Sequence, residues 1–296
     1  MSFSFDRSSP SPFSSSSSPA SPASTAPLAS AASAASASSC LPAVVGRLRE
    51  AGCVFAEDEA ELLLSAARTP AELTAMVERR ACGHPLEHVV GWAEFCGLRI
   101  AVEPGVFVPR RRTEFLVRRA ASSRPDAGVV VDLCCGSGAV GAALAAALPG
   151  TGVELYASDV EPVAVRCARR NLPQGARVLE GDLFEPLPGG LRGRVDILAA
   201  NVPYVPTEEV GLLPAEARVH EPLVALDGGT DGLDVLRRVT AKAGGWLAPG
   251  GILLFETSEH QAADALAAVA DGGLVPGADR CDERYATVVV GTKPAG

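Results

Sequence analysis

Residues 129–138 have the sequence VVVDLCCGSG, in which an apolar run leads directly into a glycine-rich turn. A short apolar run that ends at glycines is typical of a buried strand, and the Ala-rich residues from Ala139 predict that a helix follows. This alternation continues, with further strands expected at 153–157, 177–179, 195–200, 251–255 and 286–290. Such alternation predicts an α/β fold, a mostly parallel doubly wound sheet with helices on both faces and ligands at the carboxyl ends of the strands.

The residues before this α/β domain differ from it in composition. Residues 1–40 are almost wholly Ser, Ala and Pro, which bury too little apolar surface to offset the entropy of ordering, so we expect a disordered tail. Across residues 41–86 apolar residues recur at helical spacing, and Pro70 is placed to begin a third helix. The pattern predicts a small N-terminal helical domain.

A linker is expected between the two domains, at residues 87–124. Strand-like runs at 88–90 and 98–102 flank a stretch that begins and ends with glycine, which predicts a hairpin, and a short helix is expected near 113–120. The α/β domain then occupies residues 125–296.

Composition narrows the class of protein. The net charge of -9 and sequence pI near 5.1 disfavour binding to nucleic acid, and no apolar stretch is long enough to span a membrane. The eight cysteines form no C-x-x-C pair and lie near no histidine cluster, so neither a metal site nor a disulfide framework is expected. We therefore expect a cytoplasmic protein with reduced cysteines.

The glycine-rich turn has the features of a nucleotide-type ligand loop. Backbone N–H groups in such a turn approach a ligand closely, and Asp159, at the end of the next strand, is placed to accept both hydroxyls of a ribose. Gly136, Gly138 and Gly141 also form G-x-G-x-x-G, so a nicotinamide-dependent dehydrogenase is an alternative. Asp132, at the end of the first strand, favours a cationic ligand such as S-adenosylmethionine. After the third strand, Asp182 would lie beside an adenine amino group and Leu183 against its ring.

The tetrad Asn201-Val202-Pro203-Tyr204 follows the strand at 195–200 and is a variant of the N-P-P-Y motif. An amide nitrogen is a poor nucleophile, so an enzyme must position and polarise it. The side-chain oxygen of Asn201 and the backbone carbonyl of Val202 can each accept one N–H, and Tyr204 can stack on the flat group. Pro203 restricts Val202 to extended conformations, which keeps its carbonyl in place.

The tetrad and the loop together resemble class I S-adenosylmethionine-dependent methyltransferases, with a Rossmann-like sheet, that act on planar amide or aromatic amino nitrogens. Residues 79–88, 91–98, 106–114 and 220–232 further resemble the HemK-type protein-(glutamine-N5) methyltransferases. This resemblance implies methylation of the glutamine in a Gly-Gly-Gln loop of a peptide-chain release factor.

The resemblance also implies roles for particular residues, and we expect the helical domain to recognise the substrate. The tetrad would hold the glutamine amide, with Arg110 and Glu114 as supporting substrate contacts. The cofactor would be held by Asp132, Cys134, Cys135, Gly136, Ser137, Gly138, Asp159, Asp182, Leu183 and Asn201. The sequence departs from the family pattern at Cys134, where glycine is expected, at Val202, where proline is expected, and at Arg111 and Arg112, where proline and an acid are usual.

Two other functions remain open at this point. The same tetrad suits an N6-adenine or other nucleic-acid amino-group methyltransferase, although the acidic balance and the presence of only two lysines, Lys242 and Lys293, count against one. A binding protein that has kept the fold but lost turnover is the second alternative, for which Val202 and Cys134 are the hints.

Overall fold

The structure is a computed structural model that describes residues 29–148 and 152–295, with residues 29–39 described by backbone alone. A division after Leu41 separates the N-terminal part of the chain from the compact unit Pro42–Gly296. Helix α1 (Ala29–Glu50) begins inside the stretch that we expected to be disordered, so the expectation of disorder is wrong for residues 29–40. The rest of that stretch, residues 1–28, lies outside the described residues. The reason is composition, because this part of the tail is rich in Ala, the residue with the highest helix propensity.

The helical domain contains α2 (Ala56–Ala66), α3 (Pro70–Ala81) and α4 (Leu86–Val90) beside the last turns of α1. Pro70 is the first residue of α3 as predicted, and the hydroxyl of Thr69 caps the helix by accepting the N–H of Glu72. Leu48 and Leu63 are fully buried, so the predicted helical periodicity corresponds to a real core.

The hairpin differs from its prediction in one strand. It pairs β1 (Trp92–Phe95) with β2 (Leu98–Ala101), whereas residues 88–90 belong to α4. Strand propensity in this β-branched run is overridden by tertiary contacts: His88 is buried, its Nε2 lies 2.8 Å from the carbonyl oxygen of Val106, and Gly91 ends the helix in a left-handed conformation.

A seven-stranded sheet forms the centre of the α/β domain, in the order β5-β4-β3-β6-β7-β9-β8. The strands from β5 to β7 are parallel, and β9 pairs antiparallel with both β7 and β8, so the predicted mostly parallel sheet is confirmed. The strands are β3 (Val129–Leu133), β4 (Glu154–Asp159), β5 (Arg177–Glu180), β6 (Val195–Ala200), β7 (Leu247–Thr257), β8 (Val275–Cys281) and β9 (Ala286–Thr292).

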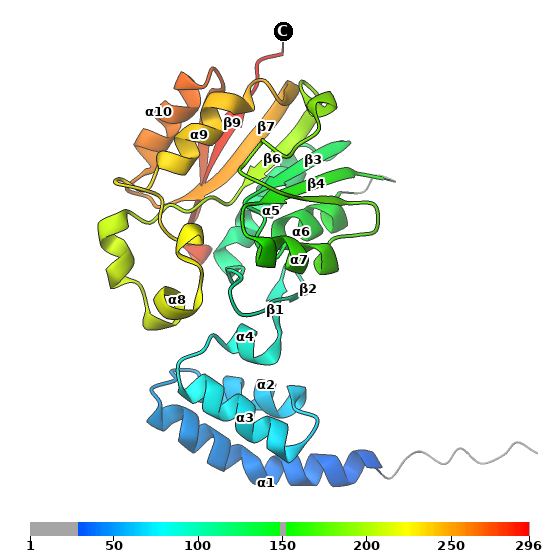
Figure 1. Ribbon diagram of the computed structural model, residues 1–296, viewed down its shortest axis with the longest axis vertical. Helices are drawn as coiled ribbons and strands as arrows, with labels where there is room; N and C mark the ends of the chain where they lie inside the picture. The colour runs from blue at the N-terminus through cyan, green and yellow to red at the C-terminus, as the bar shows by residue number, and fades with distance from the viewer. Residues whose placement is uncertain (1–28, 149–151, 296) are drawn as a thin grey trace, which may run out of the picture. The chain divides into compact units, whose positions relative to one another are not determined.

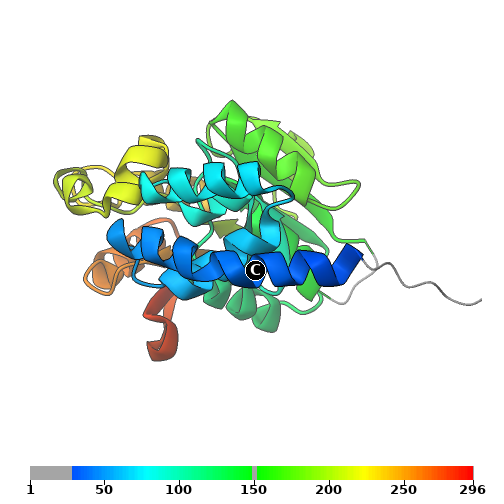
Figure 2. The same ribbon diagram turned by 90° about the horizontal axis from the view of Figure 1, so that it is seen from below.

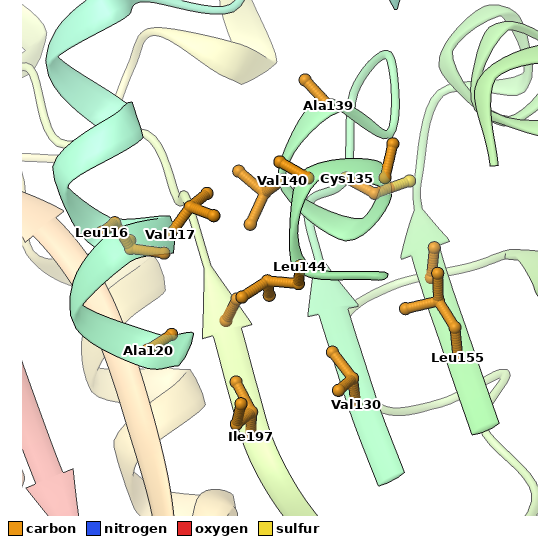
Figure 3. Close-up of a cluster of buried hydrophobic side chains, with 14 of the residues drawn as sticks. Leu116, Val117, Ala120, Val130, Cys135, Ala139, Val140, Leu144, Leu155 and Ile197 are labelled. Carbon is orange, nitrogen blue, oxygen red and sulfur yellow. The ribbon is translucent and has the colours of Figure 1, made fainter. Parts of the chain in front are cut away.

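Helices cover both faces of this sheet (Figure 1). One face carries α5 (Glu114–Ser123), α6 (Ala139–Ala147) and α7 (Pro162–Asn171), and the other carries α9 (Asp234–Ala243) and α10 (Ala262–Asp271). Figure 3 shows the first face, where side chains of α5 and α6 meet those of β3, β4 and β6. Alternate strand residues thus point into two separate apolar layers, as expected of a doubly wound sheet.

The segment between β6 and α9 contains the short helix α8 (Ala215–His220), and we call residues 205–226 the α8 segment. It meets the end of α3 and the residues between α3 and α4 (Figure 2). Arg80 Nη1 lies 3.5 Å from Glu216 Oε2, and the rings of His84 and His220 lie 4.2 Å apart, centroid to centroid. These contacts connect the helical domain to the segment that follows the tetrad.

Candidate active site

Strand order places the predicted site at the centre of the sheet. From β3 the chain builds outward to β4 and β5 on one side, and β6 then lies on the other side of β3. A crevice forms where strand order reverses in this way. Leu133 pairs with Ser158 of β4 and with Ala200 of β6, so the next residues, among them Asp159 and Asn201, converge at one edge.

A first cavity opens at this edge, over the glycine-rich turn. Cys134 and Gly136 have positive φ angles of 53° each and Gly138 one of 77°, so the turn uses the left-handed conformation that glycine adopts most readily. The predicted residues that line this cavity are Asp132, Cys134, Cys135, Gly136, Ser137, Asp159, Asp182, Leu183, Asn201 and Pro203.

Gly138 is the one predicted cofactor residue that does not line the first cavity. A Cβ atom there would lie 3.1 Å from the Cβ of Ala168 and 3.2 Å from Leu172. The glycine therefore allows the start of α6 to pack closely on α7. Gly138 thus shapes the loop and packs against α7, and the role in cofactor binding that the resemblance implied for it stays a prediction.

Asp132 contributes a buried carboxyl group to the first cavity. Its Oδ2 accepts the backbone N–H of Gly141 at 2.8 Å, while Oδ1 has no hydrogen-bond partner among the described residues. Burial raises the pKa of this group to about 7. A buried carboxylate oxygen without a donor is costly, and a cationic ligand in the cavity would remove that cost.

Asp159 holds the glycine-rich turn in shape. Its Oδ2 accepts the N–H of Gly136 at 2.8 Å and its Oδ1 accepts the N–H of Glu161 at 2.9 Å. Burial raises the pKa of Asp159, and the two N–H donors oppose that rise. The carboxylate still borders the cavity, which is where a ribose acceptor is expected.

The turn after β5 contains Asp182 and Leu183, which both line the first cavity. Asp182 forms an ion pair with Arg238 of α9, a residue that the sequence did not indicate. Leu183 adopts a left-handed conformation with φ of 52°, and its carbonyl oxygen accepts the hydroxyl of Ser158 at 2.8 Å. The apolar side chain is thereby fixed at the wall.

A second cavity lies next to the first, and the tetrad forms the boundary. Asn201 and Pro203 line both cavities, whereas Val202 and Tyr204 line only the second. Phe107, Thr113 and Ala225 are also shared. The predicted reactive residues thus lie between two adjacent hollows, one of which extends under the α8 segment.

Tyr204 is tied into a polar cluster that the sequence did not indicate. Its hydroxyl donates to Glu256 Oε1 at 2.8 Å and accepts from Arg112 Nη2 at 2.7 Å. Glu256 also accepts from Arg112 Nε at 2.6 Å and from the hydroxyl of Thr113 at 2.7 Å. Glu256 follows the apolar run of β7 directly, so it carries the same signal, an acid at a strand end, that pointed to Asp132 and Asp159.

Burial, followed by the negative charge of Glu256, raises the pKa of Tyr204. The phenol therefore stays protonated at neutral pH and presents a fixed ring to the second cavity.

Of the two predicted supporting contacts, only Arg110 reaches the second cavity. It pairs with Glu221 at 2.6 Å, and the other oxygen of Glu221 accepts the N–H of Val108 at 3.1 Å. Glu114 lines neither cavity, and its role as a supporting substrate contact stays a prediction. Its carboxylate instead accepts the N–H of Cys96 at 3.0 Å and pairs with Arg284 at 2.6 Å.

The cysteines add no further chemistry at this site. All eight are free, and burial raises the pKa of both Cys134 and Cys135, so these thiols stay protonated. Within the described part of the chain, no group of three metal-ligating side chains comes together, and no helix has the length and apolar character needed to cross a membrane.

Comparisons with known proteins agree with this geometry. A family model described as "Methyltransferase small domain" matches residues 97–220. The release factor glutamine methyltransferase of Geobacter sulfurreducens is 40% identical over 242 residues, covering 75% of this chain and 84% of that protein. The chain belongs to the release factor glutamine methyltransferase family.

Two further relatives show how this family and its neighbours vary. The release factor glutamine methyltransferase of Moorella thermoacetica is 40% identical over 226 residues, covering 71% of this chain and 77% of that protein. A protein of Streptomyces pristinaespiralis named 4-amino-L-phenylalanine/4-methylamino-L-phenylalanine methyltransferase is 38% identical over 197 residues, covering 63% of this chain and 65% of that protein. Similar identity is thus compatible with different methyl acceptors, and the residues of the site must support the choice of substrate.

Proposed function

We propose that this family member transfers the methyl group of S-adenosylmethionine to the side-chain amide nitrogen of a glutamine, the one in the Gly-Gly-Gln loop of a peptide-chain release factor. One observation carries the proposal: Asn201 and Pro203 line both the first and the second cavity. A methyl donor in one hollow and an amide in the other would meet at the tetrad, as a direct transfer between two bound groups requires.

The residues of the first cavity fit S-adenosylmethionine. The unpartnered oxygen of Asp132 suits a positively charged ligand, Asp159 suits the ribose hydroxyls, and Leu183 offers an apolar wall for a base. When bound, the cofactor supplies an electrophilic methyl group on a sulfonium. The glycine-rich turn lets its backbone come close to such a ligand.

The residues of the second cavity fit a primary amide. The side-chain oxygen of Asn201 and the carbonyl of Val202 would each accept one N–H, which orients the nitrogen toward the first cavity. The Tyr204 ring would lie against the flat amide. Because the pKa of Tyr204 is raised, its hydroxyl does not serve as a base, and the nitrogen loses its proton to solvent after transfer. Catalysis rests on position and polarisation.

The helical domain and the α8 segment supply the surface for a protein substrate. Val54 and Phe55 are 84% and 68% exposed at the turn before α2, and Leu212 of the α8 segment is 82% exposed. Exposed apolar side chains on these two segments fit a protein contact surface. A release factor as substrate fits a cytoplasmic enzyme. The eight free cysteines fit the same location.

Methyl transfer from labelled S-adenosylmethionine to a purified release factor tests the proposal. We expect label on the Gly-Gly-Gln glutamine, and a loss of at least about a hundredfold in rate for Asn201→Ala, because one of two amide acceptors is removed. Calorimetry should show that the variant keeps measurable cofactor binding, weaker than that of the wild type because Asn201 also lines the first cavity. An unlabelled release factor with cofactor-bound wild-type protein would overturn the choice of substrate, and an undiminished rate in Asn201→Ala would overturn the role of the tetrad.

A further inference from the structure

Glu256 lies in the wall of the second cavity. It lies near the end of β7, its side chain is only 3% exposed, and it accepts hydrogen bonds from three different side chains: Arg112, Thr113 and Tyr204. Arg112 also donates to the Tyr204 hydroxyl, which closes a ring of three interactions between Arg112, Glu256 and Tyr204. Charge-assisted bonds of this kind are short and directional.

Tyr204 is held at its other end as well. Its backbone carbonyl accepts from Gln261 Nε2 at 2.8 Å, and the same nitrogen donates to the carbonyl of Asp231 at 2.9 Å. The side-chain oxygen of Gln261 accepts from the hydroxyl of Ser258 at 2.7 Å, so the glutamine is itself fixed. Both the phenol oxygen and the main chain of Tyr204 therefore have defined positions before any substrate arrives.

We propose that Glu256 is a positioning residue of the methyl transfer: by holding the Tyr204 hydroxyl, with Arg112 as its counter-ion, it sets the plane of the ring against which the substrate amide lies. This inference rests on the proposed function. Glu256 acts through Tyr204 and orients the amide lone pair along the line of transfer. Small errors in such alignment lower the rate of the chemical step more than they lower binding.

The ion pair with Arg112 has a specific purpose in this arrangement. A carboxylate buried to this extent requires a compensating charge or donors, and Arg112 provides two N–H groups, one to Glu256 and one to Tyr204. Arg112 stands where the family pattern suggested an acid, and an acid there would face Glu256 with a like charge. The arginine instead donates to both Glu256 and the tyrosine hydroxyl.

The test compares Tyr204→Phe, Glu256→Gln and the double variant in steady-state methylation of a release factor. Tyr204→Phe keeps the ring and removes only its anchored hydroxyl. We expect each single variant to lower kcat about tenfold, with KM and the cofactor Kd changed less than about twofold. The double variant should be no slower than the slower single variant, because both changes break the same contact.

The chain contains a matched control on the other side of β3. The hydroxyl of Tyr156 donates to Glu154 at 2.7 Å, and Arg194 pairs with the other oxygen of Glu154 at 3.1 Å. This second tyrosine, glutamate and arginine cluster lines neither cavity. Glu154→Gln and Tyr156→Phe should therefore leave kcat at the wild-type value, which excludes a general effect of losing such a contact.

Arginine variants add a test by conservative rescue. Arg112→Lys keeps a positive donor and should retain several times more activity than Arg112→Met, which leaves Glu256 without its counter-ion. Wild-type kcat in Glu256→Gln, or losses that multiply in the double variant, would overturn the positioning role. If wild-type protein fails to methylate the release factor, the proposed function fails instead, so the two failures are distinguishable.

Discussion

Asp132 shows how one side chain links the stability of the site to its ligand. The carboxyl group is buried, one of its oxygens has no partner among the described residues, and its pKa is raised to about 7. The folded chain therefore binds this proton more tightly than the unfolded chain does. Without a ligand, the free energy of unfolding should fall as pH rises from about 4 to about 7 and level off above that window.

Cofactor affinity should rise as pH rises, whereas the free energy of unfolding falls. A positively charged ligand binds the ionised carboxylate, so affinity should rise toward pH 7, with Kd improving by up to about tenfold per pH unit below the pKa. Isothermal titration calorimetry between about pH 5.5 and 8 measures the cofactor Kd at each pH. Asp132→Asn should bind more weakly and with a flatter profile, because its amide does not titrate.

Other ionisable groups in the first cavity determine how much the pH profile of cofactor binding differs between the wild type and Asp132→Asn. Asp159, Asp182, Glu161 and Arg238 line the same space, and burial also raises the pKa of Asp159. Some pH dependence should therefore persist in Asp132→Asn. Identical profiles for the variant and the wild type would show that Asp132 does not titrate on binding.

The sequence predicts residues at or just after strand ends, such as Asp159 and Asn201, because parallel strands bring their carboxyl ends together. It does not predict Arg238 as a cavity residue, because that role depends on how α9 packs. For a similar reason, the sequence does not predict the partners of Glu114. Its carboxylate is satisfied by Cys96 and by Arg284, which is remote in sequence.

At the level of elements, two glycines of the glycine-rich turn have different structural roles. Gly136 and Gly138 both have positive φ angles, but only Gly138 lies against another helix, where an added Cβ would meet the Cβ of Ala168 at 3.1 Å. At Gly136 no heavy atom lies within 4 Å of where a Cβ would be. The turn therefore combines conformational freedom at one glycine with close packing of α6 on α7 at the other.

Alanine substitutions at the two glycines should lower the free energy of unfolding by different amounts. Gly136→Ala should lower the free energy of unfolding by about 1 kcal/mol, the cost of a left-handed alanine. Gly138→Ala should lower it by about 2–4 kcal/mol, because overpacking against α7 adds to that cost. Urea denaturation without cofactor measures both, and equal losses would show that packing against α7 does not matter.

The order of strands and helices follows from the sequence where apolar runs are long. The runs of β3, β6 and β9 predict strands because they are short and mostly apolar, as buried strands are. The edge strand β8 was not predicted, since Val275–Cys281 contains proline and glycine and is mostly exposed. Its pairing with β9 is a tertiary contact that the local sequence pattern does not predict.

At the scale of the whole molecule, the helical domain is connected to the site through charge pairs. Arg80 binds Glu59 of α2 at 2.6 Å and reaches Glu216 of the α8 segment. The same charges act on the thiol of Cys53, whose pKa burial raises, so the turn before α2 lies near this connection. The exposed Val54 and Phe55 follow immediately in the chain. A protein substrate that enters the second cavity would thus find an apolar surface within reach.

A charged residue on this surface should weaken binding of the whole release factor without affecting chemistry. We expect Val54→Asp to raise KM for the protein about tenfold, since an apolar contact is replaced by a charge that must be desolvated. For a short Gly-Gly-Gln peptide, which does not extend to the helical domain, kcat and KM should stay unchanged. Val275→Asp is the matched control, because Val275 is 57% exposed on β8 and lines neither cavity. An equal rise in KM for peptide and protein would place the effect inside the cavity, and an unchanged KM for the protein would remove this turn from the recognition surface.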